Sequence, residues 1–164
     1  MLAVVGVAAM VAVGGWLLMR PSGAPIHAPD TGGSTAGHIT GDSTDLAVLD
    51  GNTLRVGTAV VRLAGIAAPA RGTICHGDRL MEFDCGSAAA NALAALVRDA
   101  EVDCTIRGHD RLGRPVGDCL AGGRKLSQTL VQQGWARATT ADLHAPEADA
   151  RSAQRGIWRS TDRS

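Results

Sequence analysis

Four cysteines are the residues of this sequence whose type and spacing most directly suggest a chemical role. Cys104 and Cys119 lie at nearly equal separations on either side of Leu112, so a hairpin folded about Leu112 would make them near cross-strand neighbours at disulfide distance. Cys75 and Cys85 bracket a short loop, which a second local bridge would close. The alternatives are a structural zinc site, although no C-x-x-C pair exists, and four reduced thiols. Two disulfides would place the domain in the periplasm or outside the cell.

The stretch "RLAGIAAPA", Arg62 to Ala70, is informative for the chemistry that it lacks. It follows the hairpin signal "LDGNTL", and beyond Arg62 it has no polar side chain. One kind of enzyme places its metal-binding carboxylates in such a segment. The loop between the first two cysteines does contain ionisable residues, which are His76, Asp78, Glu82 and Asp84. We interpret these four as a solvated loop, with a cation site as the alternative.

The segments around these residues predict strands first. Residues 45–66 alternate apolar and polar side chains in short runs rich in Val and Leu, broken at Asp50–Asn52 and Val56–Thr58. Because both breaks carry turn chemistry, we predict three antiparallel strands in a meander. Residues 101–123 return to strand composition and predict two further strands folded about Arg111–Gly113.

Three helices are predicted from apolar residues at helical spacing. The first covers residues 86–100, with Ser87 as its N-cap, and the other two cover residues 125–136 and 145–158, each stopping near a glycine. The predicted fold class is therefore mainly β plus α. Five short strands would form a small closed or partly open barrel of the OB type, with binding on one barrel face and its flanking loops.

The chain opens with nineteen residues that carry no charge, "MLAVVGVAAMVAVGGWLLM". A helix of that length spans about 30 Å, the thickness of the hydrocarbon core of a bilayer. We predict that residues 1–20 form a transmembrane anchor; a cleaved export signal and a buried core helix are the alternatives. Arg20 alone follows the apolar run, and a literal positive-inside reading would keep the rest of the chain in the cytoplasm, against the indication from the cysteines.

The rest of the chain divides by composition. Residues 21–43 are rich in Gly, Pro, Ser and Thr without a hydrophobic period, which predicts a flexible linker. The folded domain is expected over residues 44–158, and residues 159–164 form a C-terminal tail.

Overall composition argues neither for nor against nucleic acid as a partner. Acidic and basic residues balance at 16 each, and Lys125 is the single lysine. Tyrosine is absent and Phe83 is the only phenylalanine, beside Trp16, Trp135 and Trp158. A protein that binds single strands by stacking bases on aromatic rings is hard to build from this set. We expect the last two tryptophans to anchor the helices.

Five segments resemble the thermonuclease family, the staphylococcal nuclease-like domain, in order and spacing. They are "VLDGNTLRV", "VRLAGIAAPA", "DRLGRPVGDC", "LVQQGWARA" and "EADARSAQRGIW". The resemblance implies an OB barrel with three helices and a calcium-dependent phosphodiesterase site that cuts DNA and RNA. The version with two cysteine pairs is similar to exported bacterial members, some of which are labelled as exopolysaccharide (succinoglycan) biosynthesis proteins.

The resemblance also implies that this chain lacks the family's acidic residues. The two metal-ligand positions fall on Asn52 and Ala67, and the position of the general base falls on Ala70. Asp50 matches an aspartate that forms the turn. Calcium takes six to eight oxygen ligands and favours carboxylates, and only Asn52 offers a side-chain oxygen among the three replaced positions. We therefore expect no calcium and no other cofactor.

Two arginines that clamp the phosphate in the family fall on Arg62 and Arg114. With Arg111 close by, they would make a cationic notch for phosphate or another anion, because guanidinium groups bind oxyanions bidentately. The alternative is a structural role in which Arg62 pairs with Asp50 or Asp110.

Other positions of the family's site also differ. Leu112 stands where the resemblance places a tyrosine, and residues 138–144 contain none of the tyrosines that contact nucleotides in the family. His109 would be a substitute general base in a metal-free phosphodiesterase, and the alternative is an exposed turn histidine without a catalytic role.

The leading functional hypothesis is a nuclease-like domain that is inactive as a calcium-dependent nuclease and acts as a binding or interaction module. Its partners would be the bacterial inner membrane, through the N-terminal helix, a phosphate or other anionic ligand at the arginine pair, and nucleic acid weakly. The domain would face the periplasm, or be secreted if the N-terminal segment is cleaved. The second hypothesis is a weak or metal-independent phosphodiesterase acting on DNA or RNA. The third is a structural domain that holds a protein partner in the cell envelope.

Overall fold

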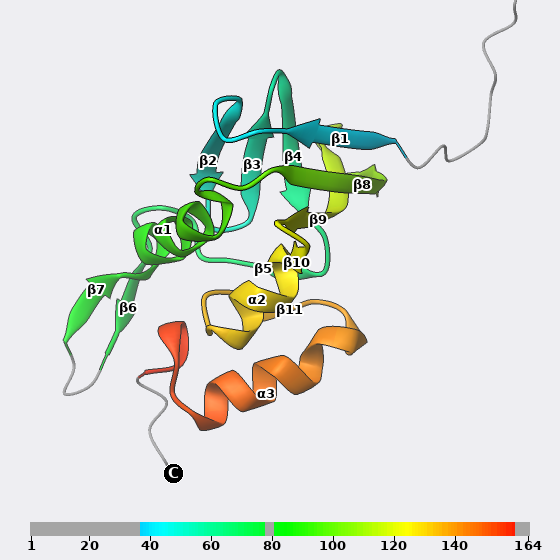
Figure 1. Cartoon of the computed structure of the whole chain (residues 1–164). Helices are drawn as coiled ribbons and strands as arrows, with labels where there is room; N and C mark the ends of the chain where they lie inside the picture. The colour runs from blue at the N-terminus through cyan, green and yellow to red at the C-terminus, as the bar shows by residue number, and fades with distance from the viewer. Residues whose placement is uncertain (1–36, 78–80, 160–164) are drawn as a thin grey trace, which may run out of the picture. The chain divides into compact units, whose positions relative to one another are not determined.

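The computed structural model describes residues 37–77 and 81–159 (Figure 1). The predicted transmembrane anchor at residues 1–20, the predicted linker up to residue 36 and the end of the predicted tail fall outside these residues. In the part of the chain that the structure describes, no helix combines the length and the apolar character needed to cross a membrane.

The predicted meander is confirmed. Strands β2 (Leu46–Asp50), β3 (Thr53–Val56) and β4 (Ala59–Leu63) pair antiparallel in chain order. Alternation along β3 and β4 turns Leu54 and Leu63 into the core, where both are fully or almost fully buried.

The second predicted pair of strands is confirmed as well. Strands β8 (Val102–His109) and β9 (Pro115–Ala121) form an antiparallel hairpin in which Cys104 lies directly opposite Cys119. These two cysteines form a disulfide, as the spacing about the turn predicted. Gly113 in the turn has a φ of +75°, a conformation that favours glycine.

The sheet is larger than predicted and it is open. Its strands follow the order β1-β8-β9-β4-β3-β2, β10 (Arg124–Lys125) pairs with β9 beside this path, and β4 and β9 run parallel. Strand β1 (His38–Gly41) pairs with β8 inside the range predicted as linker, so the folded part begins before Thr44. The prediction of a five-stranded barrel is thus corrected to a seven-stranded sheet, in which no ladder among the described residues closes a barrel.

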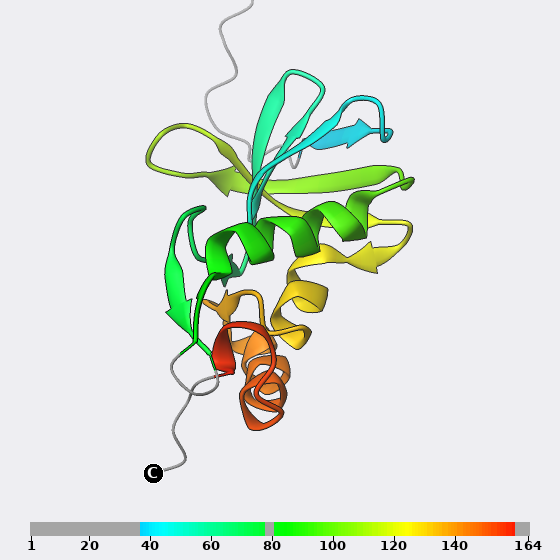
Figure 2. The same ribbon diagram turned by 90° about the vertical axis from the view of Figure 1, so that its left-hand side faces the viewer.

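Three helices are present, as predicted. Helix α1 (Cys85–Val97) buries Ala89, Leu93 and Leu96 against the sheet, and α2 (Leu126–Gln132) and α3 (His144–Ser152) lie below it (Figures 1 and 2). The N-cap of the first helix is corrected from Ser87 to Asp84. The carboxylate of Asp84 accepts hydrogen bonds from the backbone N–H of Ser87 at 2.7 Å and from its hydroxyl at 2.6 Å. The helix begins at Cys85, so Asp84 stands at the cap position and Ser87 lies within the first turn.

The third helix ends earlier than predicted. It stops at Ser152, and Gln154 has a φ of +50°, after which the 3-10 turn η3 (Gly156–Trp158) begins. The backbone N–H of Ile157 donates to the carbonyl of Gly134, which follows α2, at 2.9 Å. A backbone hydrogen bond therefore joins the segment that follows α2 to the turn η3.

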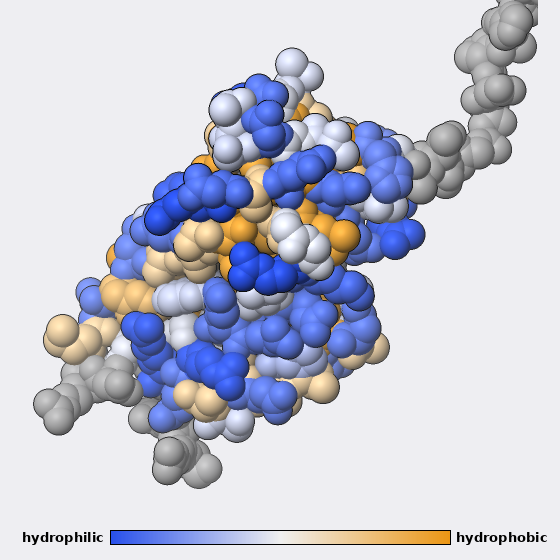
Figure 3. Space-filling view, in the orientation of Figure 1, coloured by the Kyte–Doolittle hydropathy of each residue, from blue (hydrophilic) through white to orange (hydrophobic). Residues whose placement is uncertain are grey.

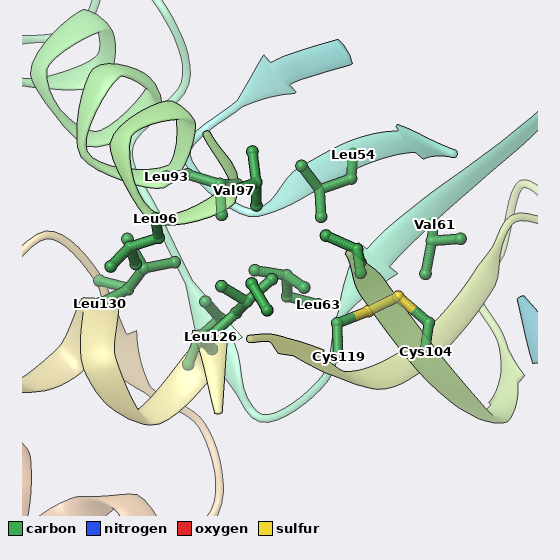
Figure 4. Packing of buried hydrophobic residues seen from close by; sticks show 14 of the residues in the cluster. Leu54, Val61, Leu63, Leu93, Leu96, Val97, Cys104, Cys119, Leu126 and Leu130 are labelled. Atoms are coloured by element: carbon green, nitrogen blue, oxygen red, sulfur yellow. A yellow bond between two sulfur atoms is a disulfide. The ribbon is translucent and has the colours of Figure 1, made fainter. Parts of the chain in front are cut away.

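A single hydrophobic core lies between the sheet and the first two helices (Figure 4). The disulfide between Cys104 and Cys119 lies within that core, near Val61 and Leu63 (Figure 4). The second predicted disulfide, Cys75–Cys85, is also formed. It connects the short hairpin of β6 (Ile74–His76) and β7 (Glu82–Asp84) to the first residue of α1.

Candidate oxyanion site

The turn between β2 and β3 is packed tightly against two neighbours. A Cβ placed on Gly51 would lie 2.7 Å from the Cβ of Ala89 in α1 and 2.8 Å from the Cβ of Ala68. The backbone N–H of Asn52 donates to Oδ1 of Asp50 at 2.9 Å, so Asp50 forms the turn as the resemblance implied. The close packing and the aspartate together fix the position of Asn52, whose side chain is buried.

Asn52 contacts one of the two candidate arginines. In the amide orientation that satisfies both of its ends, Nδ2 donates to Oδ1 of Asp50 at 2.8 Å, and Oδ1 accepts from Nη2 of Arg62 at 3.2 Å. Ion pairs of Arg62 with Asp50 or Asp110, the predicted alternative, are not found among the described residues. The half-buried guanidinium of Arg62 therefore faces a neutral amide.

The second candidate arginine is paired with a carboxylate. Nε of Arg114 donates to Oδ2 of Asp110 at 2.7 Å, while Oδ1 accepts from the backbone N–H groups of Leu112 at 2.9 Å and Arg114 at 3.0 Å. Burial opposes ionisation of Asp110, but the backbone N–H and guanidinium of Arg114 and the N–H of Leu112 outweigh it and hold its pKa below the usual value. Arg114 keeps its Nη groups for a ligand, with part of its charge neutralised.

The strand register relates the two arginines. Arg62 on β4 lies opposite Val116 on β9, and Arg114 is two residues before Val116. The neighbouring pair, Leu63 and Gly117, is buried and faces the core. Because side chains alternate along a strand, Arg62 faces away from the core, and Arg114 lies in the β8–β9 turn, two residues before the Val116 that pairs with Arg62.

The remaining positions of the family's site carry only methyl groups. Ala67 ends the short strand β5 (Ile66–Ala67) and lies opposite Arg137 of β11 (Arg137–Ala138). Ala70 is exposed at the N-terminus of α1, where a Cβ on Gly86 would collide with its carbonyl group. Neither alanine has a side-chain oxygen. The donor set at Asn52, Ala67 and Ala70 thus does not fit calcium, and in residues 37–77 and 81–159 no group of three His, Cys, Asp or Glu side chains is arranged to hold a metal ion.

The other ionisable residues considered in the sequence lie apart from this arrangement or have structural partners. His109 ends β8, is exposed and lies opposite Pro115, and its side chain forms no hydrogen bond or ion pair within the described residues. His76 lies 3.5 Å from Glu82 across the β6–β7 hairpin, and Asp84 caps α1. These three loop residues are thus used within the hairpin and the helix cap, and the fourth, Asp78, lies outside the described residues.

A cavity of about 600 Å³, which the sequence did not indicate, lies beside the outer face of the β8–β9 hairpin. Its polar lining comes from β8, β9, β10, the start of α2 and the turn η2 (Ala141–Leu143) with the residue before it. The polar lining residues are Thr105, Arg107, Asp118, Lys125, Ser127, Gln128, Thr140 and Asp142. Residues from five separate segments line it, so no local motif could have revealed it. The view in Figure 3 shows hydrophilic residues over most of one face and a smaller hydrophobic area between the sheet and the helices.

The aromatic residues in the described part of the chain are engaged with arginines. The guanidinium carbon of Arg151 lies 4.1 Å and that of Arg137 lies 5.0 Å from the centre of the Trp158 ring. Arg159 lies 5.6 Å from the ring of Trp135 and 5.7 Å from that of Phe83. These cation–π contacts connect the chain's last described turn to α3, β11 and the β6–β7 hairpin.

Comparison with known proteins agrees with the arrangement of these segments. The family model described as "Staphylococcal nuclease homologue" matches residues 60–160. The "Succinoglycan biosynthesis protein ExoI" of Rhizobium meliloti (strain 1021) is 33% identical in an alignment of 119 residues that covers 69% of this chain. The matched segment covers 62% of the length of that relative.

Proposed function

We propose that this chain, which belongs to the staphylococcal nuclease homologue family, binds a phosphate or another oxyanion at Arg62 and Arg114 and does not cleave phosphodiesters by a calcium-dependent route. The observation that carries the proposal is the pairing of Arg62 with the neutral amide of Asn52, beside positions where Ala67 and Ala70 supply no oxygen. The site has both arginines, and none of the three replaced positions supplies a carboxylate to hold a metal.

The charge on Arg62 supports oxyanion binding. Within the described residues no carboxylate neutralises it, and its side chain is half-buried, where water screens the charge less than at an open surface. Hydrogen bonds from a guanidinium to an oxyanion are about twice as strong as bonds between neutral groups. An anion would therefore supply the negative partner that Asn52 does not.

The absence of cleavage follows from the missing groups. Loss of a positioned general base typically slows a reaction by about 10²- to 10⁴-fold, and loss of the metal removes several kcal/mol of charge stabilisation in addition. His109 has no contact that would orient it toward Arg62 or Arg114. No group in the described site replaces either function.

We further propose that residues 1–20 anchor the protein in the bacterial inner membrane with the domain in the periplasm, where a protein partner of the envelope is available. The apolar character of this segment and the two disulfides of the domain support this location.

The test of the proposed function is cleavage of single-stranded DNA by the oxidised full-length protein, in calcium and in chelator. It is compared with the triple variant Asn52→Asp, Ala67→Asp, Ala70→Glu. We expect only the triple variant to cut, and only in calcium. Calcium-dependent cleavage by the natural protein would overturn the proposal. Cleavage in chelator that Arg114→Ala abolishes would instead favour a metal-independent phosphodiesterase.

Arg137, the neighbour of position 67, calls for one further control variant. Ala67 lies directly opposite Arg137, and opposite residues of an antiparallel pair place their side chains on the same side. A carboxylate introduced at position 67 would therefore lie near the Arg137 guanidinium, which competes with calcium for it. Adding Arg137→Gln to the triple variant should increase its calcium affinity, and the fourfold variant is the better test of restored cleavage.

A further inference from the structure

We infer that the ligand of this site is a phosphorylated polyhydroxyl compound, such as a hexose phosphate, with its phosphate on the arginines and its hydroxyl groups in the adjoining cavity. The inference rests on the proposed oxyanion binding by Arg62 and Arg114, and it specifies what is attached to the anion. Three observations carry it: the position of the cavity, its mixture of hydrogen-bonding groups, and its lack of aromatic side chains.

The cavity begins close to the pair formed by Arg62 and Val116, along the same two strands. Arg62 lies opposite Val116, and the backbone N–H of Ala64 donates to the carbonyl of Gly117 at 2.9 Å. Ala64 and Asp118 line the cavity, each two residues further along than the Arg62–Val116 pair. Two residues of a strand span about 7 Å, so a ligand of the size of a sugar phosphate would reach from one to the other.

The cavity offers donors and acceptors together. Asp142 is an acceptor, Lys125 is a donor, and Thr105 and Thr140 can do either. Asp118 on the same wall is already paired with Arg107, whose Nε donates to Oδ2 of Asp118 at 2.7 Å. Lys125 and Asp142 take part in no ion pair among the described residues, so both keep their hydrogen-bonding capacity for a ligand. A hydroxyl group donates one hydrogen bond and accepts others, and a lining of this mixed kind therefore matches a polyol better than a ligand that carries charge of one sign throughout.

The volume fits a small molecule. At about 600 Å³ the cavity is within the range of about 300–1,000 Å³ that is usual for small-molecule sites. Gly65 on its wall has a φ of +75°, and a Cβ there would lie 2.9 Å from the hydroxyl of Thr140. Glycine at this position thus keeps the Thr140 hydroxyl uncovered on that side.

A nucleobase would find no stacking partner in this cavity. None of the residues that line it is aromatic. The three aromatic residues of the described chain, Phe83, Trp135 and Trp158, contact arginines at the helical end instead. Because stacking on aromatic rings supplies much of the affinity of base-binding sites, this cavity favours a sugar over a base.

The test is calorimetric titration of the oxidised full-length protein with inorganic phosphate, glucose 6-phosphate and thymidine 5′-monophosphate. We expect glucose 6-phosphate to bind about tenfold or more tightly than inorganic phosphate, because several added hydrogen bonds suffice for such a factor. Thymidine monophosphate should bind no more tightly than phosphate.

Variants of the cavity and of the arginine test the two parts of the ligand separately. Asp142→Asn and Thr140→Val preserve side-chain size, and each should weaken the binding of glucose 6-phosphate severalfold and leave the binding of phosphate unchanged. Arg62→Ala should weaken the binding of both. The control is Arg98→Ala, which removes an exposed arginine at the end of α1.

The outcomes separate this inference from the proposed function. If phosphate binds and glucose 6-phosphate binds no better, the inference is wrong and oxyanion binding stands. If thymidine monophosphate binds best, the cavity receives a nucleoside and the inference is again wrong. If none of the three binds, the proposed function is overturned and the inference with it.

Discussion

Nη2 of Arg62 lies 3.2 Å from Oδ1 of Asn52 in the amide orientation that satisfies both ends of Asn52. The half-buried guanidinium thus has a neutral amide where a family ligand position would carry a carboxylate. The same family position therefore changes role with one substitution. An aspartate there would neutralise the arginine and bind a cation, whereas asparagine leaves the arginine available to an anion.

The two arginines should contribute unequally to anion binding. Arg114 is already paired with Asp110 at 2.7 Å, and Arg62 has no carboxylate partner in the described chain. We expect Arg62→Ala to weaken phosphate binding about tenfold or more and Arg114→Ala to weaken it by a smaller factor. Titration with phosphate, with Arg98→Ala as the matched control, measures both. Equal losses of phosphate affinity in the two variants would mean that the ion pair between Arg114 and Asp110 does not compete with phosphate for Arg114.

The tight turn at Gly51 should tolerate no side chain. An added Cβ would lie within 2.8 Å of both Ala68 and Ala89, and α1 cannot move away without disturbing the core. We expect Gly51→Ala to lower the free energy of unfolding by about 1–3 kcal/mol, the usual cost of overpacking. Gly108→Ala is the control because a Cβ there has no neighbour within 4 Å. Urea denaturation distinguishes the two, and a Gly51→Ala variant as stable as the control would contradict this packing.

The bridge between Cys104 and Cys119 should be a major source of stability. It closes a sequence separation of 15, and both cysteines are buried in the core. Replacing both with alanine should lower the free energy of unfolding by about 3 kcal/mol in the chain-entropy model, plus the effect of the lost packing. The matched variant lacks Cys75 and Cys85, whose bridge closes a separation of 10 at an edge hairpin. The prediction is wrong if the edge pair costs more in urea denaturation.

Acid should destabilise the hairpin turn through Asp110. Its pKa is below the usual value of 3.8 because burial, which opposes ionisation, is outweighed by the Arg114 and Leu112 hydrogen bonds. Because the pKa of Asp110 is lower in the folded state, its ionised form stabilises the fold. This contribution is fully present above the unfolded-state pKa of about 3.9 and is lost as the pH falls through the lower pKa of the folded state. Between about pH 5 and pH 2, stability should therefore fall more steeply in the natural protein than in Asp110→Asn. Parallel curves from denaturation at each pH would rule out this contribution.

Much of the fold was predictable because its signals are local. The meander follows from alternation broken by turn residues, and the Cys104–Cys119 bridge follows from their nearly equal separation from the β8–β9 turn. Strand β1 was missed because His38–Gly41 is short and lacks a hydrophobic period, and its partner strand is distant in the sequence. The first helix cap was misplaced because Asp84 and Ser87 are both good caps, and only the backbone geometry distinguishes them.

The sequence by itself determined which chemical groups are available at the site. It contains arginines at positions 62 and 114 and no acid at Asn52, Ala67 or Ala70, and no folding pattern can supply a missing carboxylate. Only the tertiary structure decided the partners of those groups: an amide for Arg62, a carboxylate for Arg114, and a polar cavity built from five separate segments beside them. The physical reason is that side-chain identity is local, whereas hydrogen-bond partners and cavities depend on strand register and on packing between residues far apart in the chain.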